Sequence, residues 1–456
     1  MSDDTALFER AKEYALEYMH GVDARDVYPS DEAIRGLAAF VEDLPEDGTD
    51  ELEILRLLGE HGSPATVAQT GGRYFGFVVG GALPVTVAAR WLADVWDQNA
   101  GLYVMSPVAA TLEDVCEKWL VDLLRLPGGT AAGLVTGSSM ATLCALAAAR
   151  NHLLAAHGWD VARDGLFGAP PIRVVLSEEA HSTVFKALAL LGLGGARVER
   201  VPSDDQGRID PSQIPTLDDA TLLILQAGNV NTGAFDQFDR ICERAKADGA
   251  WVHIDGAFGL GAAASDRFGE LTASASLADS WSMDAHKTLN VPYDCGVVLC
   301  RNRAALADAL HMEGSYIAYS ENRDSMLYTP EMSRRARGVE LWAALKSLGR
   351  AGVGALVERL HDNARYFADE LSARGFEITN DVCFNQVNVY VGDEAATQRI
   401  VAAIQRSGAC WCGTSARKGK PIIRVSVCSY KTTHDDIDQS VEAFVRARAE
   451  AGGPRP

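Results

Sequence analysis

Several polar residues each follow a short apolar stretch of the sequence, and their side chains differ in chemistry. Lys287 lies in SWSMDAHKTLNVPYDCG among small and apolar residues, although lysine usually occupies a solvated surface. Asp255 ends AWVHID, where burial of a carboxylate is costly unless it meets a cation. His181 follows IRVVLSEEA, and Gly137 and Ser138 follow AAGLVT. An amine, a carboxylate, an imidazole and a hydroxyl therefore each follow an apolar stretch of the chain.

Each of these residues also has a plain structural explanation when it is considered alone. Ser138 can cap the helix that follows it, and His181 can be a polar residue with locally satisfied hydrogen bonds. Asn229, in the polar stretch AGNVNTG after ATLLILQ, can simply belong to a loop. The chemical interpretation therefore depends on the whole set and its order along the chain.

The hydrophobic pattern from residue 130 to residue 300 predicts the elements that position these residues. Short continuous apolar runs alternate with helical stretches such as SSMATLCALAAARNHLLAAHG and FDQFDRICERAKADG. This alternation predicts an α/β fold, with a mostly parallel sheet covered by helices on both faces. Ligands of such sheets lie at the carboxyl ends of the strands, so the polar residues are expected to converge there.

One cofactor needs all of these groups at one sheet edge: pyridoxal 5′-phosphate. The Lys287 amine can form a Schiff base with its aldehyde. The Asp255 carboxylate can pair with the protonated ring nitrogen, and the His181 imidazole can stack on the ring. The helix that begins near Gly137 and Ser138 can hold the phosphate at its N-terminus. The sequence therefore predicts an enzyme that uses pyridoxal phosphate.

The length of 456 residues predicts more than one domain, since a single core rarely exceeds roughly 250–300 residues. Residues 1–70 are predicted to form a helical segment, and residues 71–305 a large cofactor-binding domain. Residues 306–456 combine long helical stretches with short strand-like runs, which predicts a smaller C-terminal α+β domain.

Longer motifs connect the chain to a known family. They are HIDGAFG, DSWSMDAHKTLNVPYDCG, RYFGFV, QNAGLYVMSPVAATLE, EKWLVDLLRLP, SRRARGVELWAALKSLG and IIRVSVCSYKTTHDDID. Together these motifs resemble the group II pyridoxal-phosphate-dependent amino acid decarboxylases, from about residue 20 to residue 446. That family includes the aromatic-L-amino-acid, tyrosine, glutamate and diaminobutyrate decarboxylases.

The resemblance has implications for fold, assembly and site. It implies fold type I, the aspartate aminotransferase fold, with a seven-stranded mostly parallel sheet and a smaller C-terminal domain. It implies a homodimer with active sites at the subunit interface, in which the N-terminal segment packs on the partner. It also assigns a cofactor-binding role to each of a set of residues: Lys287, Asp255, His181, Ala257, Gly137, Ser138, His286 and Asn229.

The chain departs from the family pattern at several positions. Met140 stands where the phosphate loop usually has a glutamate, and Asp284 where the aromatic enzymes have an asparagine that contacts phosphate. An anion beside phosphate would need a proton or a bridging donor. Asn99 and Gly101 stand where the aromatic enzymes place apolar side chains near the substrate ring. An aromatic substrate is therefore not implied.

We expect decarboxylation of an L-amino acid to the corresponding amine and carbon dioxide. His181 or Tyr328 is the expected acid that returns a proton to the α-carbon, although a tyrosine at 328 can equally well pack its loop. Tyr316 and Tyr319 lie in the same stretch, GSYIAYSENRDSMLYTPEM. Alternatives on the same fold are an aminotransferase, a carbon–carbon lyase and an oxidative deamination to an aldehyde. A non-catalytic relative would be expected to have lost Lys287 or Asp255.

The composition excludes other classes of protein. The formal net charge of −20 argues against nucleic acid as a partner, because phosphate binding needs a basic patch. Neither a secretory signal nor a long apolar span is visible, which predicts a cytoplasmic protein with no membrane association. The nine cysteines are expected to be structural thiols; the pair around Trp411 lacks a matching second pair, so no metal site is expected.

Overall fold

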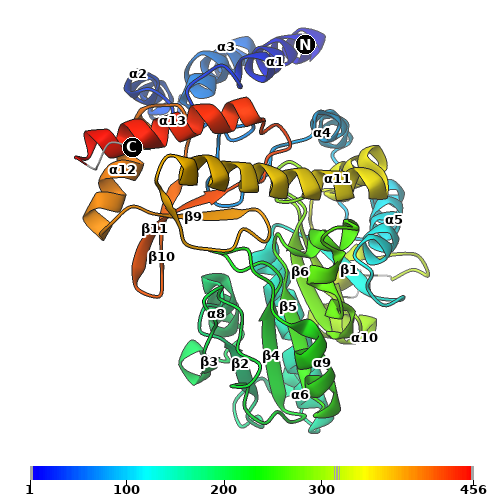
Figure 1. The fold of residues 1–456 in the computed structure, drawn as a ribbon. Helices are drawn as coiled ribbons and strands as arrows, with labels where there is room; N and C mark the ends of the chain where they lie inside the picture. Colours follow the sequence, from blue (N-terminus) through cyan, green and yellow to red (C-terminus); the bar gives the residue numbers. More distant parts are fainter. Residues whose placement is uncertain (1–3, 313, 315–316, 318, 453–456) are drawn as a thin grey trace. The chain divides into compact units, whose positions relative to one another are not determined.

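The computed structural model describes residues 4–312, 314, 317 and 319–452, and these residues form two compact units (Figure 1). The larger unit comprises Gly80–Ala364 and Asn380–Gln386. The smaller unit contains the described residues up to Val79, Arg365–Thr379, and the described residues from Val387 onward. The sequence analysis predicted three segments, with boundaries at residues 70 and 305, and predicted that the first segment packs on a partner chain. This division stays a prediction.

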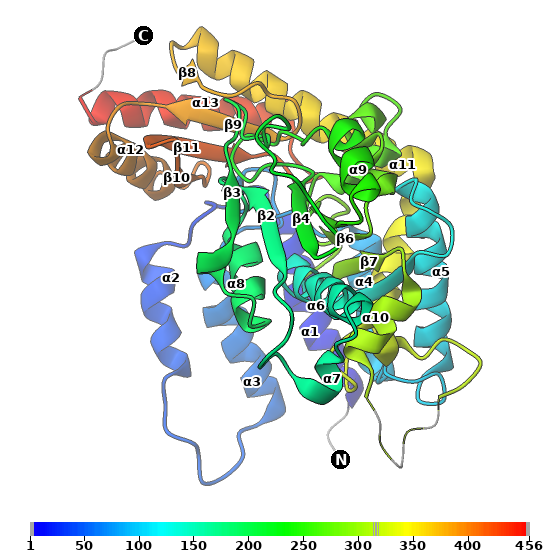
Figure 2. The ribbon, with the colours of Figure 1, turned by 90° about the horizontal axis from the view of Figure 1, so that it is seen from below.

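The larger unit is built on a seven-stranded sheet, which confirms the predicted α/β class (Figures 1 and 2). Neighbouring strands pair in parallel, except that β7 is antiparallel to both β1 and β6. In order across the sheet the strands are β1 (Ala131–Val135), β7 (Gly296–Cys300), β6 (Ser280–Asp284), β5 (Trp251–Asp255), β4 (Thr221–Gln226), β2 (Arg173–Ser177) and β3 (Glu199–Val201).

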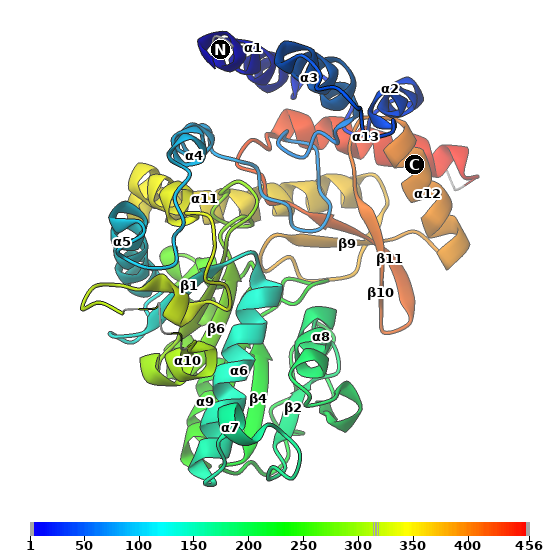
Figure 3. The same cartoon turned by 180° about the vertical axis from the view of Figure 1, so that it is seen from behind.

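Every residue of β1, β4, β5, β6 and β7 is buried, so these strands show no alternation between exposed and buried side chains. Such burial requires cover on both faces of the sheet. Figures 1 and 3 show α6 and α9 on opposite faces. The helices of this unit are α4 (Pro84–Trp96), α5 (Pro107–Leu123), α6 (Ser138–Ala156), α7 (Val161–Asp164), α8 (Ser182–Leu190), α9 (Phe238–Ala247), α10 (Arg303–Leu310) and most of α11 (Gly338–Ala373).

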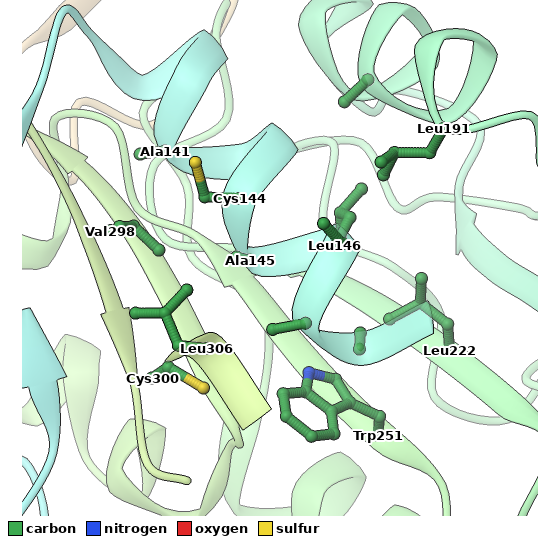
Figure 4. Packing of buried hydrophobic residues seen from close by; sticks show 14 of the residues in the cluster. Ala141, Cys144, Ala145, Leu146, Leu191, Leu222, Trp251, Val298, Cys300 and Leu306 are labelled. Carbon is green, nitrogen blue, oxygen red and sulfur yellow. The ribbon is translucent and has the colours of Figure 1, made fainter. Parts of the chain in front are cut away.

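Helix α6 lies in the middle of a large core cluster (Figure 4). Ala141, Cys144, Ala145 and Leu146 are all at most 1% exposed, and they pack with side chains of β5, β7, α8 and α10. A helix that is apolar on nearly all sides is stable only when it is buried on nearly all sides. The first residue of this helix is Ser138, so the core fixes the place of a predicted site residue.

The smaller unit contains a four-stranded sheet in the order β10 (Gly413–Arg417), β11 (Lys420–Ser426), β9 (Gln386–Tyr390), β8 (Glu377–Ile378). Helices α12 (Glu394–Arg406) and α13 (His434–Glu450) belong to the same unit. Near the N-terminus, α1 (Asp4–Gly21), α2 (Asp31–Gly36) and α3 (Glu51–Leu57) contain no buried residue. Within the described parts of the chain, no helix is long and apolar enough to cross a membrane.

The two leucines of α8 provide a matched test of the core. Leu188 is fully buried in the α6 cluster, whereas Leu190 is 67% exposed. Leu188→Ala is expected to lower the free energy of unfolding by about 2–5 kcal/mol, because it leaves a cavity. Leu190→Ala should change it by less than about 0.5 kcal/mol. Equal losses for the two variants, measured by chemical denaturation, would contradict this packing.

Candidate active site

The turn after β6 brings the predicted lysine next to a buried carboxylate. Asp284 is the last residue of β6 and is 2% exposed. Its Oδ2 lies 3.0 Å from Lys287 Nζ, and its Oδ1 lies 3.3 Å from His286 Nε2. Because His286 Nδ1 accepts the Cys295 N–H at 3.1 Å, a neutral His286 carries its proton on Nε2, facing Asp284.

The start of α6 contacts the same carboxylate. The Ser138 N–H donates to Asp284 Oδ1 at 2.5 Å, and Ser138 Oγ donates to Oδ2 at 2.7 Å. The hydroxyl therefore does not cap α6; its N-cap is Gly137, without a side-chain hydrogen bond. A Cβ at Gly296 on β7 would lie 2.4 Å from Gly137 Cα, so this close approach requires glycine.

Asp255 ends β5, beside the end of β6, and is 7% exposed. Burial raises its pKa, and the positive charges of His181 and Lys287 oppose that rise. The Ala257 N–H and Ser282 Oγ donate to Asp255 Oδ1 at 3.3 and 3.4 Å. Lys287 and His181 therefore act electrostatically on Asp255.

A buried histidine behind Asp255 was missed by the sequence reasoning. His253 Nε2 lies 3.5 Å from Ser282 Oγ, the hydroxyl that donates to Asp255. Its Nδ1 lies 3.0 Å from Ser280 Oγ. The spacing His-x-Asp on one strand places both side chains on the same face of the sheet, and that signal could have revealed it. Burial lowers the pKa of His253 to about 3, so its ring is neutral.

Two further predicted residues, His181 and Ala257, lie beside this cluster, and Asn229 lies in the loop after the neighbouring strand β4. His181 is the N-cap of α8; its Nδ1 accepts the Thr183 N–H at 3.3 Å. The carbonyl of Ala257 accepts the Asp284 N–H at 2.8 Å, so Ala257 links the ends of β5 and β6. Asn229 Oδ1 accepts the N–H groups of Asn231 and Thr232, so this side chain shapes its own loop.

Tyr328 is held elsewhere in the larger unit, in the core cluster around α6. Its hydroxyl accepts a hydrogen bond from Arg303 at 2.9 Å, and its ring packs against the guanidinium groups of Arg303 and Arg323. These contacts are consistent with a tyrosine that packs its loop, one of the two alternatives from the sequence. The other alternative, an acid that protonates the α-carbon, stays a prediction. Tyr319 Oη donates to the Met312 carbonyl at 2.7 Å, and Tyr316 lies outside the described residues.

The structure gives physical reasons for two departures from the family pattern. A Cβ at Gly101 would lie 2.4 Å from the Met332 carbonyl oxygen, so a side chain at 101 would force this backbone to move. Asn99 Oδ1 accepts the Gly101 and Arg334 N–H groups, so Asn99 holds the same turn. Met140 packs against the apolar cluster around α6.

The arrangement has the groups that pyridoxal phosphate requires: the Lys287 amine, the buried Asp255 carboxylate on which its charge acts, and a helix N-terminus that contacts Asp284, the partner of Lys287. The profile of the pyridoxal-dependent decarboxylase conserved domain matches residues 67–390. The chain belongs to this family. The enzyme therefore uses pyridoxal 5′-phosphate and decarboxylates an amino acid.

Known relatives of this decarboxylase share most of its length. It is 27% identical to the aromatic-L-amino-acid decarboxylase of Bacillus atrophaeus, over 90% of this chain and 88% of that protein. It is 26% identical to the L-2,4-diaminobutyrate decarboxylase of Rhizobium meliloti (strain 1021), over 91% and 85%. The crystal structure of Oryza sativa TDC with PLP and tryptamine superposes with a TM-score of 0.90 at 21% identity, over 99% and 98%. This likeness confirms fold type I.

Because His253 is neutral in the folded protein, the free energy of unfolding is expected to depend on pH. Its folded pKa lies below the unfolded value of about 6.5, so the unfolded state takes up the proton first. This contribution to stability is complete above pH 6.5 and is lost as the pH falls toward 3. In wild type, the loss should be roughly 1 kcal/mol per pH unit.

The measurement is the slope of the unfolding free energy between pH 6.5 and 4.5. His253→Gln should show a shallower slope than wild type, because the titrating group is gone. His20→Gln, on the exposed surface of α1, serves as the control and should keep the wild-type slope. A wild-type slope in His253→Gln would refute the assignment.

Proposed function

We propose that Lys287 is the covalent anchor of pyridoxal phosphate, and that the enzyme converts an L-amino acid to its amine and carbon dioxide. The observation that carries this proposal is the shared environment of Lys287 and Asp255. Asp255 ends β5, and Lys287 lies in the turn after the adjacent strand β6, where its charge opposes the rise that burial causes in the pKa of Asp255. When bound, the cofactor supplies an aldehyde for the amine and an electron-withdrawing ring.

The residues of the site have separate tasks in this proposal. Asp255 keeps the proton on the ring nitrogen, and the low exposure of Asp255 strengthens that ion pair. Ser138 and the N-terminus of α6 hold the phosphate. His181 stacks on the ring and positions the substrate, and His181 or Tyr328 returns a proton to the α-carbon. Lys287 would hold the aldehyde carbon of the cofactor through its amine.

The class of amino acid is the open part of this proposal. The two relatives above are named for aromatic and diamino substrates, so similarity alone leaves the class undetermined. The test supplies purified protein and pyridoxal phosphate with aromatic, acidic, diamino and aliphatic L-amino acids. Carbon dioxide and the matching amine should form in equal amounts with one class.

Lys287→Ala should lower this turnover by on the order of 10³-fold or more, because the covalent anchor is lost. Lys346→Ala, at an exposed lysine of α11, is the matched control and should keep normal turnover. Normal turnover in Lys287→Ala would overturn the proposal. A keto acid, or an aldehyde with ammonia and peroxide, would point to the other reactions of the fold.

We also propose a homodimer with active sites at the subunit interface. Its support within the larger unit is α4, where Leu92 is 55% and Val95 is 66% exposed. Trp91 and Trp96 are each 43% exposed, and Thr86 is the one fully buried residue of this helix. An apolar helix surface of this kind is normally covered by another part of the assembly.

Sedimentation of the purified protein tests this assembly. Wild type should sediment as two chains, and Leu92→Asp combined with Val95→Asp should weaken association at least about tenfold. Leu190→Asp, an exposed leucine on α8, is the control and should leave association unchanged. A wild-type monomer at micromolar concentration would contradict the proposal.

A cytoplasmic location is proposed as well. It is supported by the nine cysteines, which form no disulfide bond; eight of them are buried. Burial raises the pKa of Cys295 to about 12, so this thiol is protonated and inert. Buried free thiols are typical of proteins from a reducing compartment.

A further inference from the structure

The strongest unexplained feature of the site is that one carboxylate takes up both hydrogen-bond donors of Ser138, the first residue of α6. Ser138 presents a backbone N–H and a hydroxyl there, and both donate to Asp284. These are the donors that the proposed function assigns to the cofactor's phosphate. Asp284 therefore occupies the hydrogen-bond donors that a bound phosphate would use.

The electrostatic surroundings keep this carboxylate ionised. Burial would raise the pKa of Asp284, but Lys287, His286 and the Ser138 hydrogen bond outweigh burial, and the pKa lies below its ordinary value. Lys287 Nζ lies 3.0 Å from Asp284 Oδ2, and the protonated Nε2 of His286 lies 3.3 Å from Oδ1. Asp284 thus compensates the positive charge of Lys287.

A phosphate and an ionised Asp284 cannot both use the same donors. Each hydrogen of Ser138 makes one strong hydrogen bond, and two anions at that distance repel each other strongly where water is excluded. The N-terminus of a 19-residue helix attracts either anion. Binding of the phosphate must therefore displace the Asp284 carboxylate from Ser138 or leave it in repulsive contact.

We propose that Asp284 is an internal competitor of the cofactor's phosphate: it occupies the phosphate donors of Ser138 when the cofactor is absent and lowers cofactor affinity. This inference rests on the proposed function, because it requires the phosphate to bind at the start of α6. Asp284 is a positioning residue in this scheme. It holds Ser138, His286 and Lys287 in place and gives up its contact with Ser138 to the ligand.

Asp284→Asn is the variant that isolates the charge. The amide has nearly the same shape, and its oxygen can still accept the Ser138 N–H, but the repulsion of phosphate is gone. The cofactor-free enzyme is titrated with pyridoxal phosphate, with pyridoxal, which lacks the phosphate, and with inorganic phosphate. Binding is followed by protein fluorescence and equilibrium dialysis, without any measurement of turnover.

Asp284→Asn should bind pyridoxal phosphate and inorganic phosphate at least about tenfold more tightly than wild type, as expected for removal of a like charge in a buried site. The dissociation constants of the two proteins for pyridoxal should agree within about threefold, because pyridoxal has no phosphate to bind Ser138. Asp279→Asn is the control: Asp279 precedes β6 at the strand's other end, accepts the Val252 N–H, and should leave all three affinities unchanged.

Three results would overturn the proposal. Weaker binding of pyridoxal phosphate by Asp284→Asn would show that the carboxylate strengthens cofactor binding. If Asp284→Asn bound pyridoxal more tightly by the same factor as pyridoxal phosphate, the effect would lie at Lys287 and not at the phosphate. If Asp284→Asn bound all three ligands as wild type does, Asp284 would not compete with the phosphate. Failure of the proposed function gives a different result, namely no saturable binding of pyridoxal phosphate to wild type.

Discussion

The ammonium group of Lys287 lies at the end of a buried strand, and the carboxylate of Asp284 balances its charge at 3.0 Å. A charge in such surroundings is stable only with a partner close by. The same carboxylate also contacts His286 and the first residue of α6. Strand β6, its following turn and helix α6 are therefore joined at one side chain, and the local shape of the site depends on that junction.

A second carboxylate, Asp255, lies on the adjacent strand and has different surroundings. Burial dominates at Asp255 and raises its pKa, whereas cations and hydrogen bonds dominate at Asp284 and lower it. The difference suits two tasks. Asp255 has spare capacity for a cationic partner, while Asp284 is already fully engaged. Two acids of the same kind can thus serve one site without being interchangeable.

The strands and the main reactive groups could be predicted because local sequence specifies them. Continuous apolar runs predicted buried strands, and polar residues at their ends predicted one reactive edge. The hydrogen bonds from Ser138 to Asp284 could not be predicted, since they join residues 146 positions apart whose distance depends on strand order. The packing of Tyr328 depends similarly on Arg303 and Arg323, which sequence alone does not bring to its ring.

The burial of α6 has a consequence for the kinetics of cofactor exchange. Most of its side chains from Ala141 to Ala149 are buried in the core, so the helix cannot shift without opening that core. The contact between Gly296 and Gly137 likewise fixes the backbone before the helix. The adjustable part of the junction is then the Asp284 side chain. Exchange at this site is therefore expected to need movement of the Asp284 side chain, and not the far slower local unfolding of the backbone.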